Sequence, residues 1–326
     1  MTDRSTRWSR FGWAVLLAVV SACVLTLPWT FGHVQQGAAS EPRYAASNLS
    51  LNLLPPTWMA MDDFDAHRLE RAEGTPAYVP GRALGTDASG RDFLARLLAG
   101  GVFSLSVGLA SAAIAVVIGT LWGAIAGFVG GRTDAILMRI VDVLYGLPSV
   151  LLVVLLAVAV DGVVGRSGRQ LSPGQGQLLG LVTLLVAIGG TSWLTMSRVI
   201  RGQVLSLRAQ PFMEGCRAIG VPAWKQFVRH LLPNLVGPIV VYATLAVPAA
   251  ILSESFLSFL GIGVREPTPS WGSLASDGLS QVNLVHSRWW LLVAPCVLIA
   301  ATLVALNFIG DSLRARFDPT ANRARW

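Results

Sequence analysis

Histidine, lysine, cysteine and acidic residues build most catalytic and metal sites, but this chain of 326 residues spreads them widely. The four histidines, His33, His67, His230 and His286, stand at no spacing typical of metal ligands. The single lysine, Lys225, follows a tryptophan, whereas a phosphate-binding loop places its lysine after a glycine. The sequence therefore predicts no metal site, no catalytic residue and no ATP binding by this chain.

Two charged groups leave other chemistries open. Asp87, Arg91 and Asp92 precede an apolar segment, where acids beside a guanidinium would suit acid–base catalysis by a membrane enzyme. A capped helix start with a surface ion pair explains the same three residues without chemistry. An ion-driven carrier would need ionisable groups in mid-membrane, but Asp142 and Glu254 fall near the ends of their apolar segments. Turnover by the isolated chain would support the enzyme, and uptake without ATP would support the carrier.

The elements that must position these residues are apolar segments long enough to cross a membrane. Hydrophobic residues make up 53% of the chain and charged residues 13%, against about 25% charged in soluble domains. A bilayer core of ~30 Å needs roughly 20 apolar residues per helix. The sequence therefore predicts an all-α membrane protein with six spans, and Pro148 should bend the third or mark an irregular entry. The spans cover about residues 11–31, 102–128, 136–160, 177–197, 234–254 and 289–310.

Polar segments divide the chain into four parts. A tail with the first span precedes an outer segment, then a five-helix core and a second tail. The outer segment is expected to end in an interfacial amphipathic helix at 84–98, with Arg91, Asp92 and Arg96 off its apolar face. The first span could instead be a cleaved signal peptide, although its length favours a retained helix. The four parts are residues 1–32, 33–100, 101–311 and 312–326.

The distribution of charge predicts the orientation of the chain. Six spans place both termini on one side of the membrane, together with the loop at 198–233. By this placement that side carries 15 of the 25 basic residues and six of the 18 acidic ones. Because basic residues collect in cytoplasmic loops, we expect both termini and this loop in the cytoplasm. The net charge of +7 then reflects topology, and no nucleic-acid partner is expected.

Small residues recur at every fourth position of the second predicted span. Such a stripe lies along one side of a helix and lets a neighbouring helix approach closely. The neighbour could belong to this chain or to a partner, and we expect a packing seam within the chain. The residues are Ser111, Ala115, Gly119, Gly123 and Gly127.

The basic loop at 198–233 is expected to fold as a helix, a tight turn and a second helix. Gly220 can adopt the left-handed conformation that ends a helix, and Pro222 is suited to start the next. Pro233 and Asn234 are expected to end that second helix. Its apolar face would then rest on the membrane surface, or the hairpin would serve as a docking element for another protein. The residues expected on that face are Trp224, Phe227, Val228, Leu231 and Leu232.

Residues 214–233 resemble the EAA loop of ABC importer permeases. Glu214, Gly220, Leu232 and Pro233 match that pattern at its spacing. The sequence departs from it where Gly215 and Cys216 replace two alanines and where His230 replaces an isoleucine. Gly215 should weaken the docking helix by about 1 kcal/mol. The resemblance implies that an ATPase contacts this loop, through Glu214, Gly215, Cys216, Ala218, Gly220, Leu232 and Pro233.

Further segments resemble, in order, the C-type permease of dipeptide and oligopeptide importers. Val102 departs from the family, which often has arginine there, and the long 33–83 segment looks like an insertion. These two departures put the docking of the binding protein and the preference for a solute in question, more than the transport mechanism. The matching segments are Leu84–Asp87 with Gly90–Asp92, Gly130–Gly131 with Leu137–Arg139, Glu254–Gly261, Pro269–Gly272, Asn307–Asp311 and Asp318–Pro319.

This resemblance implies the type I ABC importer permease architecture in a bacterial inner membrane. The expected assembly contains a second homologous permease, two cytoplasmic ATPases that bind ATP and Mg²⁺, and an extracytoplasmic solute-binding protein. This chain would form part of the pore, would contact the lipid bilayer, and would hold no cofactor itself. Glu254 and Ser255 are expected either in the outer pathway or as a polar pair at an interface. Peptides, nickel chelates, glutathione and peptide antibiotics all remain candidate solutes.

Overall fold

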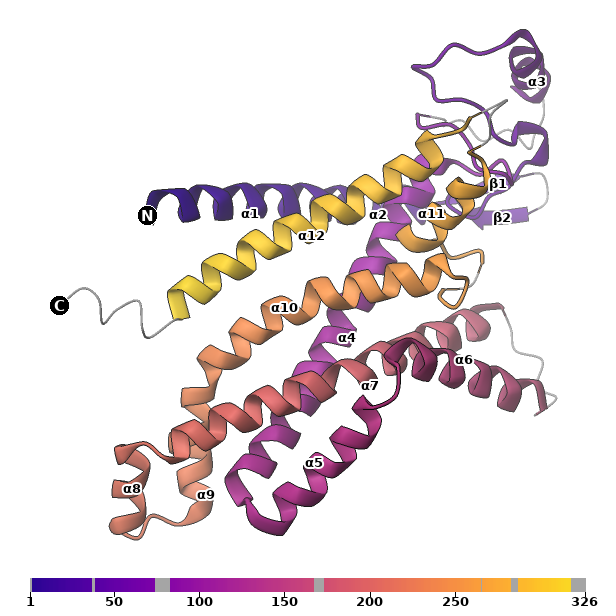
Figure 1. The fold of residues 1–326 in the computed structure, drawn as a ribbon. Helices are drawn as coiled ribbons and strands as arrows, with labels where there is room; N and C mark the ends of the chain where they lie inside the picture. The colour runs from indigo at the N-terminus through magenta and orange to yellow at the C-terminus, as the bar shows by residue number, and fades with distance from the viewer. Residues whose placement is uncertain are drawn as a thin grey trace.

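The computed structural model describes residues 2–36, 39–73, 83–166, 173–264, 266–282 and 287–317. Within them, long helices run between two ends of the molecule, and a short two-stranded ribbon is an addition to the expected all-α fold (Figure 1). The elements are α1 (Thr2–Leu25), α2 (Leu27–Thr30), β1 (His33–Gln36), β2 (Ala39–Pro42), a 3₁₀ turn at Leu49–Leu51, α3 (Asp63–Glu73), α4 (Phe93–Val129), α5 (Gly131–Tyr145), α6 (Ser149–Arg166), α7 (Pro173–Arg208), α8 (Pro211–Ala218), α9 (Ala223–Lys225), a π-helical segment at Gln226–Leu231, α10 (Leu232–Phe259), α11 (Trp271–Ser280) and α12 (Trp290–Phe317).

Among the described residues, five helices are long and apolar enough to cross a membrane, and the α5–α6 pair makes a sixth if it is counted as one span. The third predicted span is therefore two helices, inclined by 87° to each other. The break falls at Pro148, because proline lacks an N–H and disfavours the helical conformation in the residue before it. The prediction of a bend is confirmed.

The stripe of small residues packs α4 against α7 within this chain, as expected. A Cβ atom on Gly119 would lie 2.5 Å from Cβ of Met196, and one on Gly123 would lie 2.2 Å from the carbonyl oxygen of Ser197. The two backbones thus approach too closely for any side chain, which is how small residues stabilise helix pairs in membranes.

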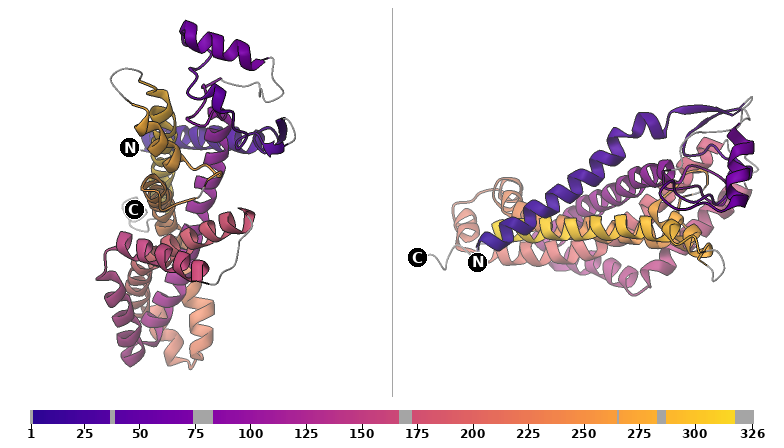
Figure 2. Two further views of the ribbon diagram at one scale, coloured as in Figure 1. Left: turned by 90° about the vertical axis from the view of Figure 1, so that its right-hand side faces the viewer. Right: turned by 90° about the horizontal axis from the view of Figure 1, so that it is seen from above.

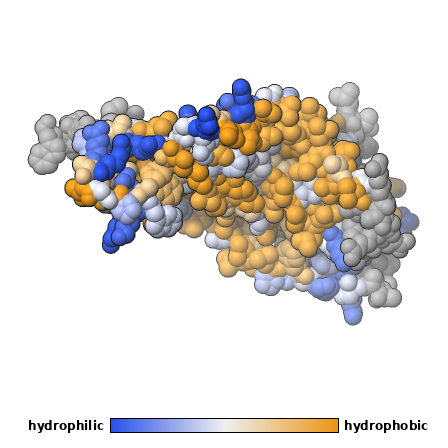
Figure 3. All heavy atoms as spheres, turned by 90° about the horizontal axis from the view of Figure 1, so that it is seen from below, coloured by the Kyte–Doolittle hydropathy of each residue, from blue (hydrophilic) through white to orange (hydrophobic). Residues whose placement is uncertain are grey.

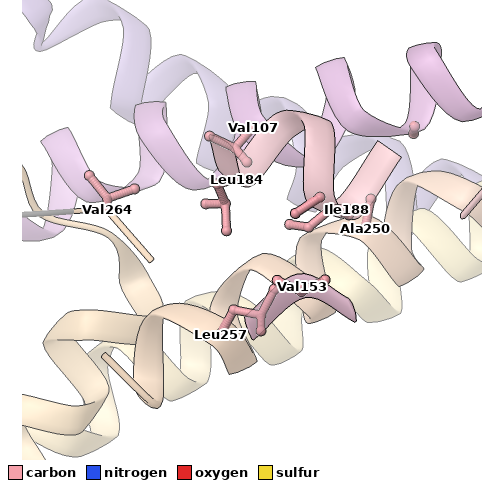
Figure 4. Packing of buried hydrophobic residues seen from close by; sticks show 9 residues of the cluster. Val107, Val153, Leu184, Ile188, Ala250, Leu257 and Val264 are labelled. Atoms are coloured by element: carbon pink, nitrogen blue, oxygen red, sulfur yellow. The ribbon is translucent and has the colours of Figure 1, made fainter. Parts of the chain in front are cut away.

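Apolar side chains hold the other helices around this pair. One cluster joins α4, α6, α7 and α10 through Val107, Val153, Ile188 and Leu257 (Figure 4). The outer surface is also apolar, and a broad hydrophobic area covers the middle of the molecule in Figure 3. An apolar exterior of this kind suits contact with lipid.

The first helix is packed as part of the bundle. Close to the ends marked N and C, α1 lies against α12, and the two helices diverge farther along (Figure 2, right). Gly12 makes this possible, since a Cβ there would lie 2.8 Å from the carbonyl oxygen of Ala305. The rings of Trp8 and Phe308 stack with centroids 5.2 Å apart. α1 is thus packed on α12 within the described bundle, and its retention in the mature protein stays a prediction.

The helix expected at 84–98 begins only at Phe93, and it continues without interruption into the second span. Residues 84–92 instead form turns, in which Gly85 and Gly90 have positive φ angles and Thr86 bridges to Asp92. Arg96 was expected on a solvated face but is fully buried. A separate interfacial helix is therefore absent from this described segment.

Other boundaries differ because helices continue through polar residues. The loop expected at 161–176 is shortened by α6, which reaches Arg166, and by α7, which begins at Pro173. The short helix α11 was not expected; Ser270 and Ser273 cap it reciprocally. The Asp318–Pro319 pair, Arg323 and Arg325 lie outside the described residues.

Candidate functional site

The hairpin at 211–225 lies at the same end of the molecule as the start of α1 and the end of α12 (Figure 1). It joins α7 to α10 through α8 and α9. α7 runs as one helix of 36 residues to Arg208, well past the expected end of its span. Any displacement of the hairpin is therefore transmitted directly to a helix of the bundle.

The inner face of the hairpin is anchored by apolar packing. Met213 is 1% exposed, and Leu231 is fully buried. Both belong to a cluster with Ile200 and Val204 of α7 and Ala124 of α4. This cluster fixes α8 and the start of α10 to the ends of two long helices.

Arg208 ties the base of the hairpin to α4. Its Nη1 donates to the carbonyl oxygen of Gly127 at 2.8 Å, and its guanidinium lies over the ring of Phe128. Phe128 in turn meets Phe227 edge-on, with ring centroids 5.1 Å apart. A cation near the last carbonyls of a helix is favourable, so this contact holds α4, α7 and the hairpin together.

The turn of the hairpin depends on Gly220, which has a φ of +74°, as the sequence predicted. The N–H of Val221 donates to the carbonyl oxygen of Cys216 at 2.9 Å, and the N–H of Gly220 donates to that of Arg217 at 3.1 Å. These bonds satisfy the last carbonyls of α8. Pro222 follows as the cap of α9.

The second helix does not end at Pro233, so that expectation was wrong. The chain stays helical into α10, with a π-helical segment at Gln226–Leu231. Pro233 has no N–H to donate to the carbonyl four residues earlier. The wider turn accommodates this, because Leu232 donates to the carbonyl oxygen five residues back, on Phe227.

The outer face of the hairpin combines charge with exposed apolar side chains. Glu214 is exposed in the first turn of α8 and forms no ion pair within the described part of the chain. Ile219 and Trp224 are 80% and 72% exposed. Trp224 was expected on the packed apolar face, which in fact holds Phe227 and Leu231. Large apolar residues this exposed beside charges are typical of protein contacts.

The remaining loop residues divide between the surface and the anchor. Gly215 and Ala218 are exposed on α8, and Cys216 is half-buried. Leu232 and Pro233 lie at the start of α10, beyond the turn. Ile219 and Phe212 were not among the expected contact residues. They could have been identified from the sequence, because both are large apolar residues close to Glu214 or Gly220 in the basic loop.

A second charged group lies at the opposite end, where Asp87, Arg91, Glu266 and Arg96 form a ring. Arg91 pairs with Asp87 at 2.7 Å and with Glu266. Arg96 lies 3.2 Å from Asp87 and 2.9 Å from Glu266. Burial opposes ionisation, but the Arg96 and Arg91 guanidiniums outweigh it and lower the pKa of Glu266. The expected surface ion pair is thus a largely buried network that ties α4 to the loop before α11.

Asp92 caps α4, as the simpler explanation predicted. Its Oδ1 accepts from the N–H groups of Leu94 and Ala95 at 3.1 and 3.3 Å. Burial raises its pKa to about 6, although these two bonds and Arg43, 3.9 Å away, favour ionisation. Such a cap stabilises the start of the longest described helix.

Glu254 and Ser255 lie inside the chain. Glu254 is fully buried, and its carboxylate accepts from Ser258 at 2.8 Å and from Ser255 at 3.4 Å. The hydroxyls of Ser104 and Ser270 also lie close to it, so that α4, α10 and the cap of α11 meet at this carboxylate. In this conformation the carboxylate acts as a buried junction between helices. A role in an outer pathway stays a prediction.

No group of three His, Cys, Asp or Glu side chains in the described ranges is placed to hold a metal ion. The charged ring around Arg96 instead joins α4 to the loop before α11. The charges of the hairpin lie on its exposed outer face. The geometry therefore fits a membrane component that moves with a partner at the hairpin end.

Comparison with known proteins points to the same kind of component. Residues 119–323 match the family described as binding-protein-dependent transport system inner membrane component. The oligopeptide transport system permease protein OppC of Haemophilus influenzae is 45% identical over 72% of this chain and 69% of its own length. The dipeptide transport system permease protein DppC of Bacillus subtilis is 40% identical over 79% and 75%. OppC of Escherichia coli K12 is 43% identical over 80% and 78%.

Proposed function

Since this chain belongs to the binding-protein-dependent transport system inner membrane components, the pore-forming subunits of ABC importers, we propose that it carries peptides across the membrane and couples through its 211–225 hairpin to an ATPase. It is a permease rather than an enzyme, and ATP hydrolysis belongs to partner subunits. Peptides are the solute class because similar proteins over most of this chain are named for oligopeptides or dipeptides.

The surface of the hairpin is the observation that supports the ATPase contact. Glu214 and Trp224 face outward, while Met213 and Leu231 fix the opposite face to α7 and α10. A partner that binds the outer residues thus grips an element that is rigidly attached to the bundle. Coupling between sites requires such an element with discrete positions.

The proposed assembly has five parts, and the hairpin faces the cytoplasm. Two related permeases form the path, and each contacts one of two ATPases that bind ATP and Mg²⁺. A solute-binding protein docks at the opposite end, near the charged ring of Asp87, Arg91, Arg96 and Glu266. ATP-driven closure moves the hairpin, and α7 follows because it continues into the hairpin with only two residues between them.

Two substitutions on the exposed face test the coupling role. Glu214→Lys and Trp224→Ala should leave the chain folded and inserted, because neither side chain is packed in the structure. Both should lower co-purification of the ATPase, by at least about tenfold for Glu214→Lys, and should abolish or slow peptide uptake. Lys225→Ala, one residue from Trp224 on the same hairpin, serves as a comparison for loss of charge alone. Normal uptake and normal ATPase recovery in Glu214→Lys would refute the proposed contact.

A further inference from the structure

A hollow of about 430 Å³ lies between the α5–α6 bend, the middle of α7 and Ser253 of α10. It is separate from the hairpin surface, the charged ring and the Glu254 junction. Its walls are partly apolar, but they also include five residues that carry hydroxyl groups. These residues are Tyr145, Thr191, Ser192, Thr195 and Ser253.

Thr195 and Ser253 are exposed residues, and their hydroxyls have no hydrogen-bond partner among the described residues. Other threonines of α7 return their hydroxyls to the helix itself. Thr183 donates to the carbonyl oxygen of Leu179 at 2.8 Å, and Thr191 donates to that of Ala187 at 3.1 Å. A hydroxyl facing hydrocarbon without a partner costs several kcal/mol. The two free groups therefore indicate that this side of α7 and α10 meets something polar.

The bend between α5 and α6 supports the same conclusion. Leu147 and Pro148 leave the helical conformation between two apolar helices, and both line the hollow. Irregular backbone at membrane depth is tolerated only where protein buries it or where it borders a water-filled cavity. Leu147 is 46% exposed, so this chain does not bury the bend.

Charged groups lie at the end of the hollow nearer the hairpin. The Arg198 guanidinium lies 4.0 Å from the centroid of the Tyr145 ring. It also donates to Asp142 at 2.8 Å, and both charged side chains are partly exposed. A cation and an anion at one end of a hydroxyl-lined hollow suit a zwitterionic solute that forms many hydrogen bonds.

We propose that this hollow is the surface on which the subunit contacts a passing peptide, with Thr195 and Ser253 bonding to the peptide backbone. Each hydroxyl can donate and accept, and each peptide unit offers both an N–H and a C=O. Such contacts are independent of the peptide's side chains, which rest against Leu144, Leu152 and Leu194. The inference depends on the peptide transport proposed above.

Thiol labelling in the complete transporter, reconstituted in liposomes, tests this assignment. Thr195→Cys and Ser253→Cys are exposed to a positively charged, membrane-impermeant methanethiosulfonate reagent, and modification is read at each position by mass spectrometry. Val297→Cys is the matched control, because Val297 is 56% exposed on α12, away from the hollow. Both test positions should react at least about tenfold faster than the control, since the reagent needs an accessible thiolate. A saturating mixture of tri- to pentapeptides should slow their reaction.

Removal of the two hydroxyls gives a second measurement. The double variant Thr195→Val, Ser253→Ala should raise the KM for peptide uptake by about fivefold, as expected for the loss of about one hydrogen bond. Reaction no faster than at Val297→Cys, with peptide uptake intact, would overturn the assignment and leave the transport function standing. A transporter that binds and carries no peptide from the mixture would contradict the proposed function itself.

Discussion

Arg96 and Glu266 meet at 2.9 Å across 170 residues of sequence. The guanidinium is fully buried at the start of α4, whereas the carboxylate is 57% exposed on the loop before α11. Asp87 approaches the same guanidinium at 3.2 Å. The loop therefore covers the Arg96 guanidinium and keeps this charge of α4 away from water.

Glu266→Ala should destabilise the chain strongly. Loss of one partner of a fully buried pair costs about 3–5 kcal/mol. Asp87 still lies 3.2 Å from Arg96 and Glu266 is 57% exposed, so we expect a loss at or below about 3 kcal/mol. Thermal unfolding of the purified chain in detergent measures the change. Glu70→Ala is the control, since the Glu70 side chain is 82% exposed in its pair with His67, and it should change stability by less than about 0.5 kcal/mol. Equal stabilities for the two variants would contradict a structural role for the ring.

Asp92 should make stability depend on pH. Its pKa is raised to about 6 in the folded chain, against about 3.9 when unfolded. Between these values the folded state binds more protons, so this residue's contribution favours folding at low pH and is lost as pH rises through 6.

Asp92→Asn should remove that dependence while it keeps the cap, because asparagine caps helices equally well. Relative to the original chain, the variant should gain about 1 kcal/mol on going from about pH 5 to about pH 7.5. Chemical unfolding at the two pH values measures the difference. A stability difference that does not change with pH would show that Asp92 is already ionised in the folded state.

Gly123→Ala should separate α4 from α7. The new Cβ would lie 2.2 Å from the carbonyl oxygen of Ser197, so the helices must move apart, at a cost of about 1–3 kcal/mol. Gly202→Ala on α7 is the control, because nothing lies within 4 Å of that position. It should leave the melting temperature unchanged or raise it. A lower melting temperature in both variants would point to a general effect of alanine rather than to the seam.

Gly220→Ala and Gly215→Ala should act in opposite directions on the hairpin. Alanine at a φ of +74° costs about 1–2 kcal/mol, which should distort the turn and reduce peptide uptake and ATPase recovery. Gly215 has open space around it, and alanine there should stabilise α8 by about 1 kcal/mol. ATPase recovery from the two variants compares them directly. Unchanged recovery in Gly220→Ala would contradict the need for a tight turn.

Residue types and their periods predicted most of the fold. Six apolar runs of sufficient length define the spans, and the four-residue repeat of small side chains identified the α4 seam, because both signals are local. The positive φ of Gly220 followed in the same way from its position between two helical segments.

The failures come from partners that are distant in sequence. Arg96 looked like a surface residue because Glu266, its partner, is 170 residues away. Trp224 shares a helical period with Phe227, but the packed face is chosen by Ile200 and Val204 of α7. Pro233 does not end the helix, because the wider turn of the preceding π-helical segment accommodates a residue without an N–H. The partners of Arg96 and of the packed face lie outside any local pattern, whereas the π-helical segment beside Pro233 is a local feature that residue types alone did not predict.

The contact between α4 and α7 also has a mechanical consequence. A helix of 36 residues is about 54 Å long. α7 packs closest to α4 at Gly119, Gly123 and Gly127, where Met196, the carbonyl oxygen of Ser197 and Val204 approach the glycines. Because the three glycines present no side chain of their own, we expect α7 to tilt about this contact when the hairpin is displaced. Such a tilt would move the far end of α7, beside α6, in the direction opposite to the hairpin.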